Sequence, residues 1–143
     1  MTLTDEQAMA QVIEAAKEMV RVAGLTDVTG GFMFESCNDQ GRPPYRGHVE
    51  MSFGIPAGAD PDAYFRQIAA ALVRHGWTDG PPPGMCPFGE VVHNEAVMAV
   101  ICHASGNTAR GSVQVSGECA NVTDHRHDGK TVGVDVSEQL SGS

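Results

Sequence analysis

The chain has 143 residues, the length of one domain, and its formal net charge is −9, from 9 basic and 18 acidic residues. Binding to nucleic acid or to an anionic membrane surface needs clustered positive charge, and the basic residues here are scattered, so neither function is expected. Hydrophobic residues make up 41% of the chain, and no apolar run approaches the ~20 residues that span a bilayer, so a globular domain is predicted.

Two segments have the apolar periodicity of helices that cover one side of a sheet. The first begins at Thr4, where Gln7 completes a capping-box pattern, and ends at Gly24. The second begins at Asp60, an N-cap residue that is followed by proline, and ends at Gly76. Both segments predict amphipathic helices.

The other ordered segments alternate in the way that strands do. The positions that carry this pattern are Phe32 and Phe34; Val49, Met51 and Phe53; Val91 and Val92; the run Val97 to Cys102; Val113, Val115, Gly117 and Cys119; and Val132, Val134 and Val136. Tight connections, without the spacing of a parallel crossover, predict an α+β fold: a two-layer α/β sandwich with two helices packed on a mostly antiparallel sheet, in the order α-β-β-α-β-β-β-β. Residues 1–143 are expected to form this one domain, with 1–3 and 141–143 flexible or vector-derived.

Four cysteines lie where strands meet loops, at Cys37, Cys86, Cys102 and Cys119. Two disulfides would pin these loops to the sheet, and three pairings are open. We favour Cys37–Cys119 and Cys86–Cys102, because the second pair lies within one half of the chain and the first then joins the halves. The alternative is four reduced cysteines in a cytosolic protein, buried or bound to a metal, although no C-x-x-C spacing is present.

Three stretches resemble the mycobacterial LppA-type lipoproteins: ESCNDQGRPPYRGHVEMSF, PAGADPDAYFRQIAAALVRHGWTDGPPPG and GECANVTDHR. The similarity extends from Gly24 to Leu140. It implies an exported protein that a lipidated N-terminal cysteine anchors to the cell envelope, and it implies no biochemical activity. The opening MTLTDEQAMA has neither a signal peptide nor that cysteine, so we expect the lipid anchor, the only membrane contact, to be absent from this chain and this form to be soluble.

The stretch TDHRHDGK is the best candidate for chemistry. On a strand, His125 and His127 would point to one face, and Asp124 would add a carboxylate, a set that suits a transition metal. This pattern supports the alternative function, a metal-dependent or hydrolytic enzyme. Gly129 and the turn-forming composition favour a solvated hairpin instead, so we assign no catalytic residue, metal or cofactor.

Tyr45, Arg46 and Trp77 are candidates for a recognition surface, because aromatic residues and arginine are enriched at binding patches. In the competing interpretation, Trp77 fills the space under the second helix. We therefore predict a non-enzymatic lipoprotein domain of the cell envelope that binds an unknown protein or a small amphiphilic ligand.

Overall fold

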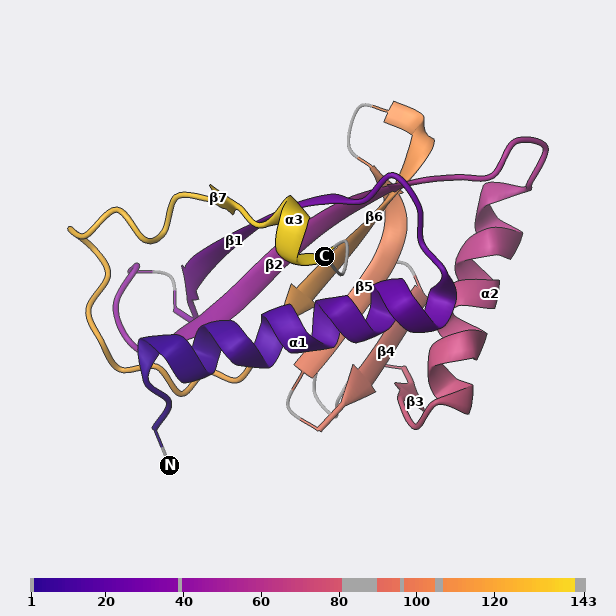
Figure 1. Cartoon of the computed structure of the whole chain (residues 1–143). Helices are drawn as coiled ribbons and strands as arrows, with labels where there is room; N and C mark the ends of the chain where they lie inside the picture. Colours follow the sequence, from indigo (N-terminus) through magenta and orange to yellow (C-terminus); the bar gives the residue numbers. More distant parts are fainter. Residues whose placement is uncertain (1, 39, 81–89, 96, 105–106, 141–143) are drawn as a thin grey trace.

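The computed structural model describes residues 2–38, 40–80, 90–95, 97–104 and 107–140, and these form two layers (Figure 1). One layer is a seven-stranded sheet with the order β3-β4-β5-β6-β2-β1-β7. Its strands are β1 (Thr29–Ser36), β2 (Tyr45–Gly54), β3 (Thr78–Asp79), β4 (Glu90–Asn94), β5 (Val97–Ala104), β6 (Asn107–Ser116) and β7 (Val134–Asp135). The helices are α1 (Asp5–Ala23), α2 (Pro61–Arg74) and the short α3 (Ser137–Leu140). Each pair of neighbouring strands is antiparallel, so the predicted α+β class and antiparallel sheet are confirmed.

The structure adds two short elements to the predicted order, and one predicted strand is shorter than expected. β3 has two residues and α3 has four, too few for apolar periodicity to show in a sequence. The alternation of Val132, Val134 and Val136 predicts a longer strand than the structure forms, because only Val134 and Asp135 belong to β7. Before β7 the chain turns, and the Val132 N–H donates to the Gly129 carbonyl oxygen across 3.3 Å.

Both long helices begin where the sequence predicts. At α1, the Gln7 N–H donates to Thr4 Oγ1 across 3.1 Å, and the Thr4 N–H donates to Gln7 Oε1 across 2.9 Å. Gly24 ends α1 with a left-handed φ of 65°, a conformation that glycine adopts without steric cost. At α2, Asp60 Oδ2 accepts a hydrogen bond from the Ala63 N–H across 3.2 Å. The local capping chemistry therefore sets both helix starts.

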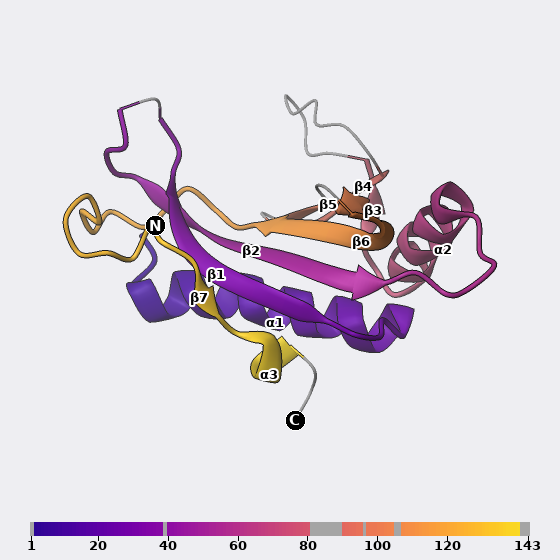
Figure 2. The ribbon, with the colours of Figure 1, turned by 90° about the horizontal axis from the view of Figure 1, so that it is seen from above.

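The core lies between the sheet and the two long helices, and Figure 2 shows α1 lying along one face of the sheet. Strand register aligns one apolar row across this face, formed by Val92, Ala99, Val115, Val49 and Phe32. These five residues are buried. The row continues to Val134 on β7, opposite Phe32, but the Val134 side chain is 57% exposed. The apolar face of the sheet thus extends beyond the part that is buried.

Gly47 allows α1 to lie close to β2. A Cβ atom at this position would lie 2.5 Å from the Ala8 carbonyl oxygen, which is part of the helix backbone and cannot turn away. Gly47→Ala is therefore expected to lower the free energy of unfolding by about 1–3 kcal/mol, the usual cost of overpacking a core. Chemical denaturation measures this value. Gly133→Ala is the control, because its Cβ would meet Met33 Cε at an ordinary 3.6 Å; equal stability of the two variants would contradict the close approach of α1.

A disulfide joins Cys37, after β1, to Cys119, after β6, as the sequence analysis predicts. The two cysteines are 82 residues apart, so the bond closes a large part of the chain. Cys102 has no disulfide partner among the residues that the structure describes, and Cys86 lies outside them. The Cys86–Cys102 bond therefore stays a prediction. Burial, together with the nearby Glu50 charge, raises the pKa of the Cys102 thiol, so this thiol is a poor nucleophile.

Candidate functional site

An apolar groove of about 350 Å³ lies between the first turns of α1 and the C-terminal segment. In Figure 1 these two segments flank β1, which forms the floor of the groove. This volume is at the lower end of the range for small-molecule sites. Its lining residues are Asp5, Glu6 and Met9 from α1, Phe32 and Phe34 from β1, and Gly129, Lys130, Val132 and Val134 from the C-terminal segment.

The wall formed by the C-terminal segment exposes apolar side chains. Val132 is 68% exposed and Val134 is 57% exposed. Val134 belongs to the row of the sheet that is buried further along, and Phe32 beside it is only 3% exposed. Exposed apolar surface next to a concave floor is typical of a site that another molecule covers. The groove thus offers surface for an aliphatic chain.

His125 supports the floor of the groove from inside the protein. Its side chain is fully buried, and its ring stacks on Phe34 with 4.1 Å between ring centroids. The ring also lies against Tyr45 in an edge-to-face arrangement at 4.9 Å. Such aromatic contacts stabilise a pair by about 0.5–1.5 kcal/mol beyond the area that they bury. His125 therefore fixes the position of Phe34.

Both ring nitrogens of His125 have hydrogen-bond partners. Nδ1 lies 2.7 Å from Asp128 Oδ2, and Nε2 lies 2.8 Å from Asn121 Oδ1. The Asn121 amide is oriented by its own Nδ2, which donates to the Leu3 carbonyl oxygen at 3.1 Å and to Asp5 Oδ1 at 2.9 Å. Neither nitrogen of His125 is open to a metal ion. The ring acts as a buried connector between the C-terminal segment and the start of α1.

Charged groups form the rim of the groove beside this connector. Lys130 Nζ lies 3.3 Å from Asp5 Oδ2, and the Lys130 side chain is 54% exposed. Partial burial raises the pKa of the Asp5 carboxyl, but hydrogen bonds from Asn121, Thr123 and Lys130 outweigh this effect and hold the pKa below its ordinary value. The hydrogen bond from His125 likewise lowers the pKa of Asp128. Both carboxylates are therefore ionised at neutral pH.

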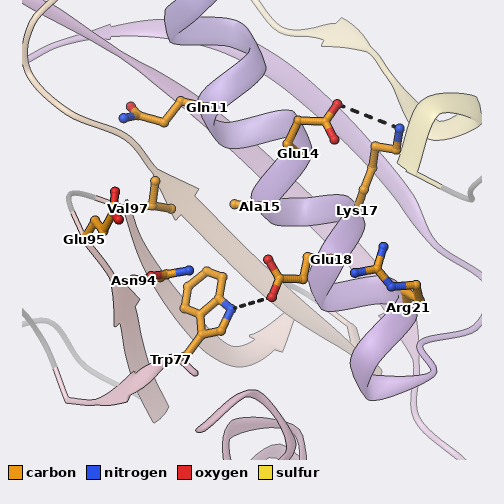
Figure 3. Close-up of a pocket in the computed structure, with 10 residues that line it drawn as sticks. All are labelled: Gln11, Glu14, Ala15, Lys17, Glu18, Arg21, Trp77, Asn94, Glu95 and Val97. Carbon is orange, nitrogen blue, oxygen red and sulfur yellow. Dashed lines mark hydrogen bonds and ion pairs between the residues drawn. The ribbon is translucent and has the colours of Figure 1, made fainter. Parts of the chain in front are cut away.

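A second hollow, of about 490 Å³, lies between α1 and the hairpin of β4 and β5 (Figure 3). Trp77 Nε1 donates to Glu18 Oε1 there across 3.3 Å, and Lys17 pairs with Glu14 at 3.9 Å. Most of its lining is charged or carries an amide: Gln11, Glu14, Lys17, Glu18, Arg21, Asn94 and Glu95, alongside Ala15, Trp77 and Val97. It therefore offers less apolar surface to a ligand than the groove beside β1.

Comparison with known proteins places the chain in a family. A family described as "Putative lipoprotein LppJ" matches residues 4–139. The chain belongs to the LppJ family. Proteins of that description in Mycobacterium tuberculosis and Mycobacterium bovis are each 48% identical to it over 132 residues, which is 92% of this chain and 69% of the relative. The predicted membership in a mycobacterial lipoprotein family is confirmed, and no solved structure matches the chain.

No helix in the described part of the LppJ-family chain combines the length and the apolar character that a membrane span requires.

The structure separates the residues of TDHRHDGK that the sequence suggests as metal ligands. His125 is fully buried, whereas His127 is exposed. Asp124 pairs with Arg126, which lowers the Asp124 pKa to about 2. In the described part of the LppJ-family chain, no three His, Cys, Asp or Glu residues are grouped so that they could hold a metal ion. The expectation that His125 and His127 share one face is wrong, because the segment is a coil with turns rather than a strand.

The predicted recognition residues do not form one exposed surface. Tyr45 is fully buried, and its hydroxyl donates to the Gly41 carbonyl. Arg46 Nε donates to Glu35 Oε1 at 2.7 Å across neighbouring strands. Trp77 is 3% exposed and belongs to the core, as the competing interpretation expected. The enrichment of aromatic residues and arginine at binding patches suggested a surface, but the rings of Tyr45 and Trp77 lie in the interior of this LppJ-family chain.

The groove itself was not predicted as a site. Its signal in the sequence is the alternation of Val132 and Val134 after the turn HDGK, which predicts an apolar strand face. What the sequence does not reveal is that no helix covers Val134 enough to bury it. That depends on how the helices pack on the sheet, which is a tertiary feature.

Proposed function

We propose that this chain is an envelope-associated lipoprotein domain that binds a small amphiphilic ligand, with the aliphatic chain of the ligand in the groove beside β1. The observation that supports this proposal most strongly is the exposure of Val132 and Val134 next to the buried rings of Phe32 and Phe34. A ligand chain would cover these valines and gain the free energy of apolar burial, about 25 cal/mol per Å².

Membership in a lipoprotein family supports the cellular location in this proposal. The relatives carry the description of a lipoprotein, and lipoproteins are held at a membrane by an N-terminal lipid. In this chain, residues at the N-terminal end of α1 line the groove, at Asp5, Glu6 and Met9. The groove therefore lies at the N-terminal end of α1, the end of the helix toward which such an anchor would connect.

The alternative function, a metal-dependent or hydrolytic enzyme centred on His125 and His127, has less support from the geometry. The two side chains lie in different environments, and both nitrogens of His125 already have partners.

Dodecyl maltoside, an amphiphile with an uncharged sugar head, tests the proposal when it is titrated calorimetrically below its micelle concentration. We expect saturable binding to one site. Replacing both Val132 and Val134 by serine should weaken binding about fivefold to tenfold, because each valine loses part of the roughly 1.5 kcal/mol that its burial contributes.

Val122→Ser is the matched control, because Val122 is 59% exposed in the same segment and does not line the groove. It should leave the affinity unchanged. Absence of saturable binding, or equal affinities for the unmodified protein and the double variant, would contradict the proposed function.

A further inference from the structure

We propose that the groove is selective for zwitterionic amphiphiles whose head joins a phosphate to an ammonium group, with Lys130 binding the phosphate and Glu6 the ammonium. This inference rests on the proposed function, because the aliphatic part of the same ligand fills the apolar groove. It specifies the class of the ligand head group, and it assigns the binding of that head group to Lys130 and Glu6.

Lys130 is placed to bind an anionic oxygen. Its backbone N–H donates to Asp128 Oδ1 at 2.9 Å, which fixes the backbone at the edge of the groove. Its Nζ lies 3.3 Å from Asp5 Oδ2, while the side chain remains 54% exposed. An ammonium group carries three N–H donors, and the contact with Asp5 uses one of them. Lys130 can therefore donate to a phosphate oxygen and keep its contact with Asp5.

Asp5 is engaged by the interior of the protein. Its Oδ1 accepts from Asn121 Nδ2 at 2.9 Å and lies 3.4 Å from His125 Nε2. Glu6, the next residue on the first turn of α1, is exposed and lines the same groove. Glu6 is therefore the carboxylate at the rim that can face an ammonium group on a ligand.

The charges at the rim disfavour head groups that carry a charge of only one sign. One lysine and two carboxylates line the groove, at Lys130, Asp5 and Glu6. A purely anionic head would meet the carboxylate of Glu6, and a purely cationic head would meet Lys130. A head that carries both charges places each beside its opposite, and such complementarity determines selectivity more than total affinity.

The test compares four amphiphiles that share a dodecyl chain, each titrated calorimetrically below its micelle concentration: dodecylphosphocholine, dodecyl phosphate, dodecyltrimethylammonium and dodecyl maltoside. We expect dodecylphosphocholine to bind most tightly, about twofold to fivefold better than dodecyl maltoside, in line with the strength of exposed charge pairs. Phosphocholine without a chain is expected to show no measurable binding at the same concentrations, because the apolar groove would stay empty.

Two substitutions assign the head contacts. Lys130→Gln should reduce the advantage of dodecylphosphocholine over dodecyl maltoside, and Lys130→Arg should restore it. Glu6→Gln should lower the affinity for dodecyltrimethylammonium and for dodecylphosphocholine, and it should raise the affinity for dodecyl phosphate. Lys17→Gln, on α1 but outside this groove, is the matched control and should change none of the affinities.

The outcomes separate this inference from the proposed function. If all four amphiphiles bind equally, or if Lys130→Gln has no effect, the selectivity for the head is wrong while binding of the chain stands. If free phosphocholine competes fully with dodecylphosphocholine, the head group binds without the aliphatic chain, and the role of the apolar groove in this inference is wrong. If none of the four binds, both the inference and the proposed function are wrong.

Discussion

Replacing Cys37 and Cys119 together by serine is expected to lower the free energy of unfolding by about 4 kcal/mol, the upper part of the usual range for a disulfide. The bond closes a loop between residues 82 apart, and long loops gain most when they are closed in the unfolded chain. It also ties the end of β1 to the segment that leads into His125. We therefore expect denaturant unfolding to show the loss of stability. We also expect the affinity of the groove for an amphiphile to fall.

The control for this pair is a polar substitution in the same region. Val122 follows Cys119 by three residues and is 59% exposed, so Val122→Ser should change the free energy of unfolding by less than about 0.5 kcal/mol. If the double serine variant were as stable as the control, the disulfide would not stabilise the fold.

His125→Ala is expected to destabilise the protein by about 3–5 kcal/mol, the range for removing a large buried ring. The substitution removes the ring that stacks on Phe34 at 4.1 Å and lies against Tyr45 at 4.9 Å. It also leaves Asn121 Oδ1 without the partner that it has at 2.8 Å, and an unpaired buried polar atom costs about 1–3 kcal/mol. Thermal and denaturant unfolding both measure this effect.

His127→Ala is the matched control, because His127 is two residues away and exposed. It should change stability by less than about 0.5 kcal/mol. His125→Phe separates the two contributions, since it keeps a ring beside Phe34 and removes the hydrogen bonds. An equal loss of stability in the two alanine variants would show that His125 is not the buried connector described above.

The sequence predicts those parts of the fold that depend on local chemistry. The capping box of Thr4 and Gln7 and the N-cap at Asp60 set the two helix starts, and both form as expected. The alternation of Val49, Met51 and Phe53 places one face of β2 in the core. These signals are readable because each rests on residues within one turn or one strand of each other.

The sequence does not predict the surroundings of His125. The composition of TDHRHDGK indicates a solvated turn, and its neighbours His127 and Asp128 are indeed exposed. His125 is buried because Phe34 and Tyr45, which lie far away in the chain, form a pocket for its ring. Contacts of this kind follow from the packing of β1 and β2 against the C-terminal segment, and no local pattern contains them.

The sequence also does not predict that the valines of the groove are exposed. Val134 continues the apolar row of the sheet, and its pattern predicts a buried position. It stays 57% exposed because β7 is a two-residue strand at the edge of the sheet. A pattern that predicts burial and a structure that leaves the residue exposed together point to a surface that a ligand can cover.

The most direct test of the central claim, that the groove beside β1 holds an aliphatic chain, is the detection of intermolecular nuclear Overhauser effects between dodecylphosphocholine below its micelle concentration and the methyl groups of the protein. The account predicts contacts from the dodecyl chain to the methyl groups of Met9, Val132 and Val134, and none to Val73, an exposed valine on α2 outside this groove. Contacts that avoid the groove, or that reach Val73 as strongly as Val134, would contradict it.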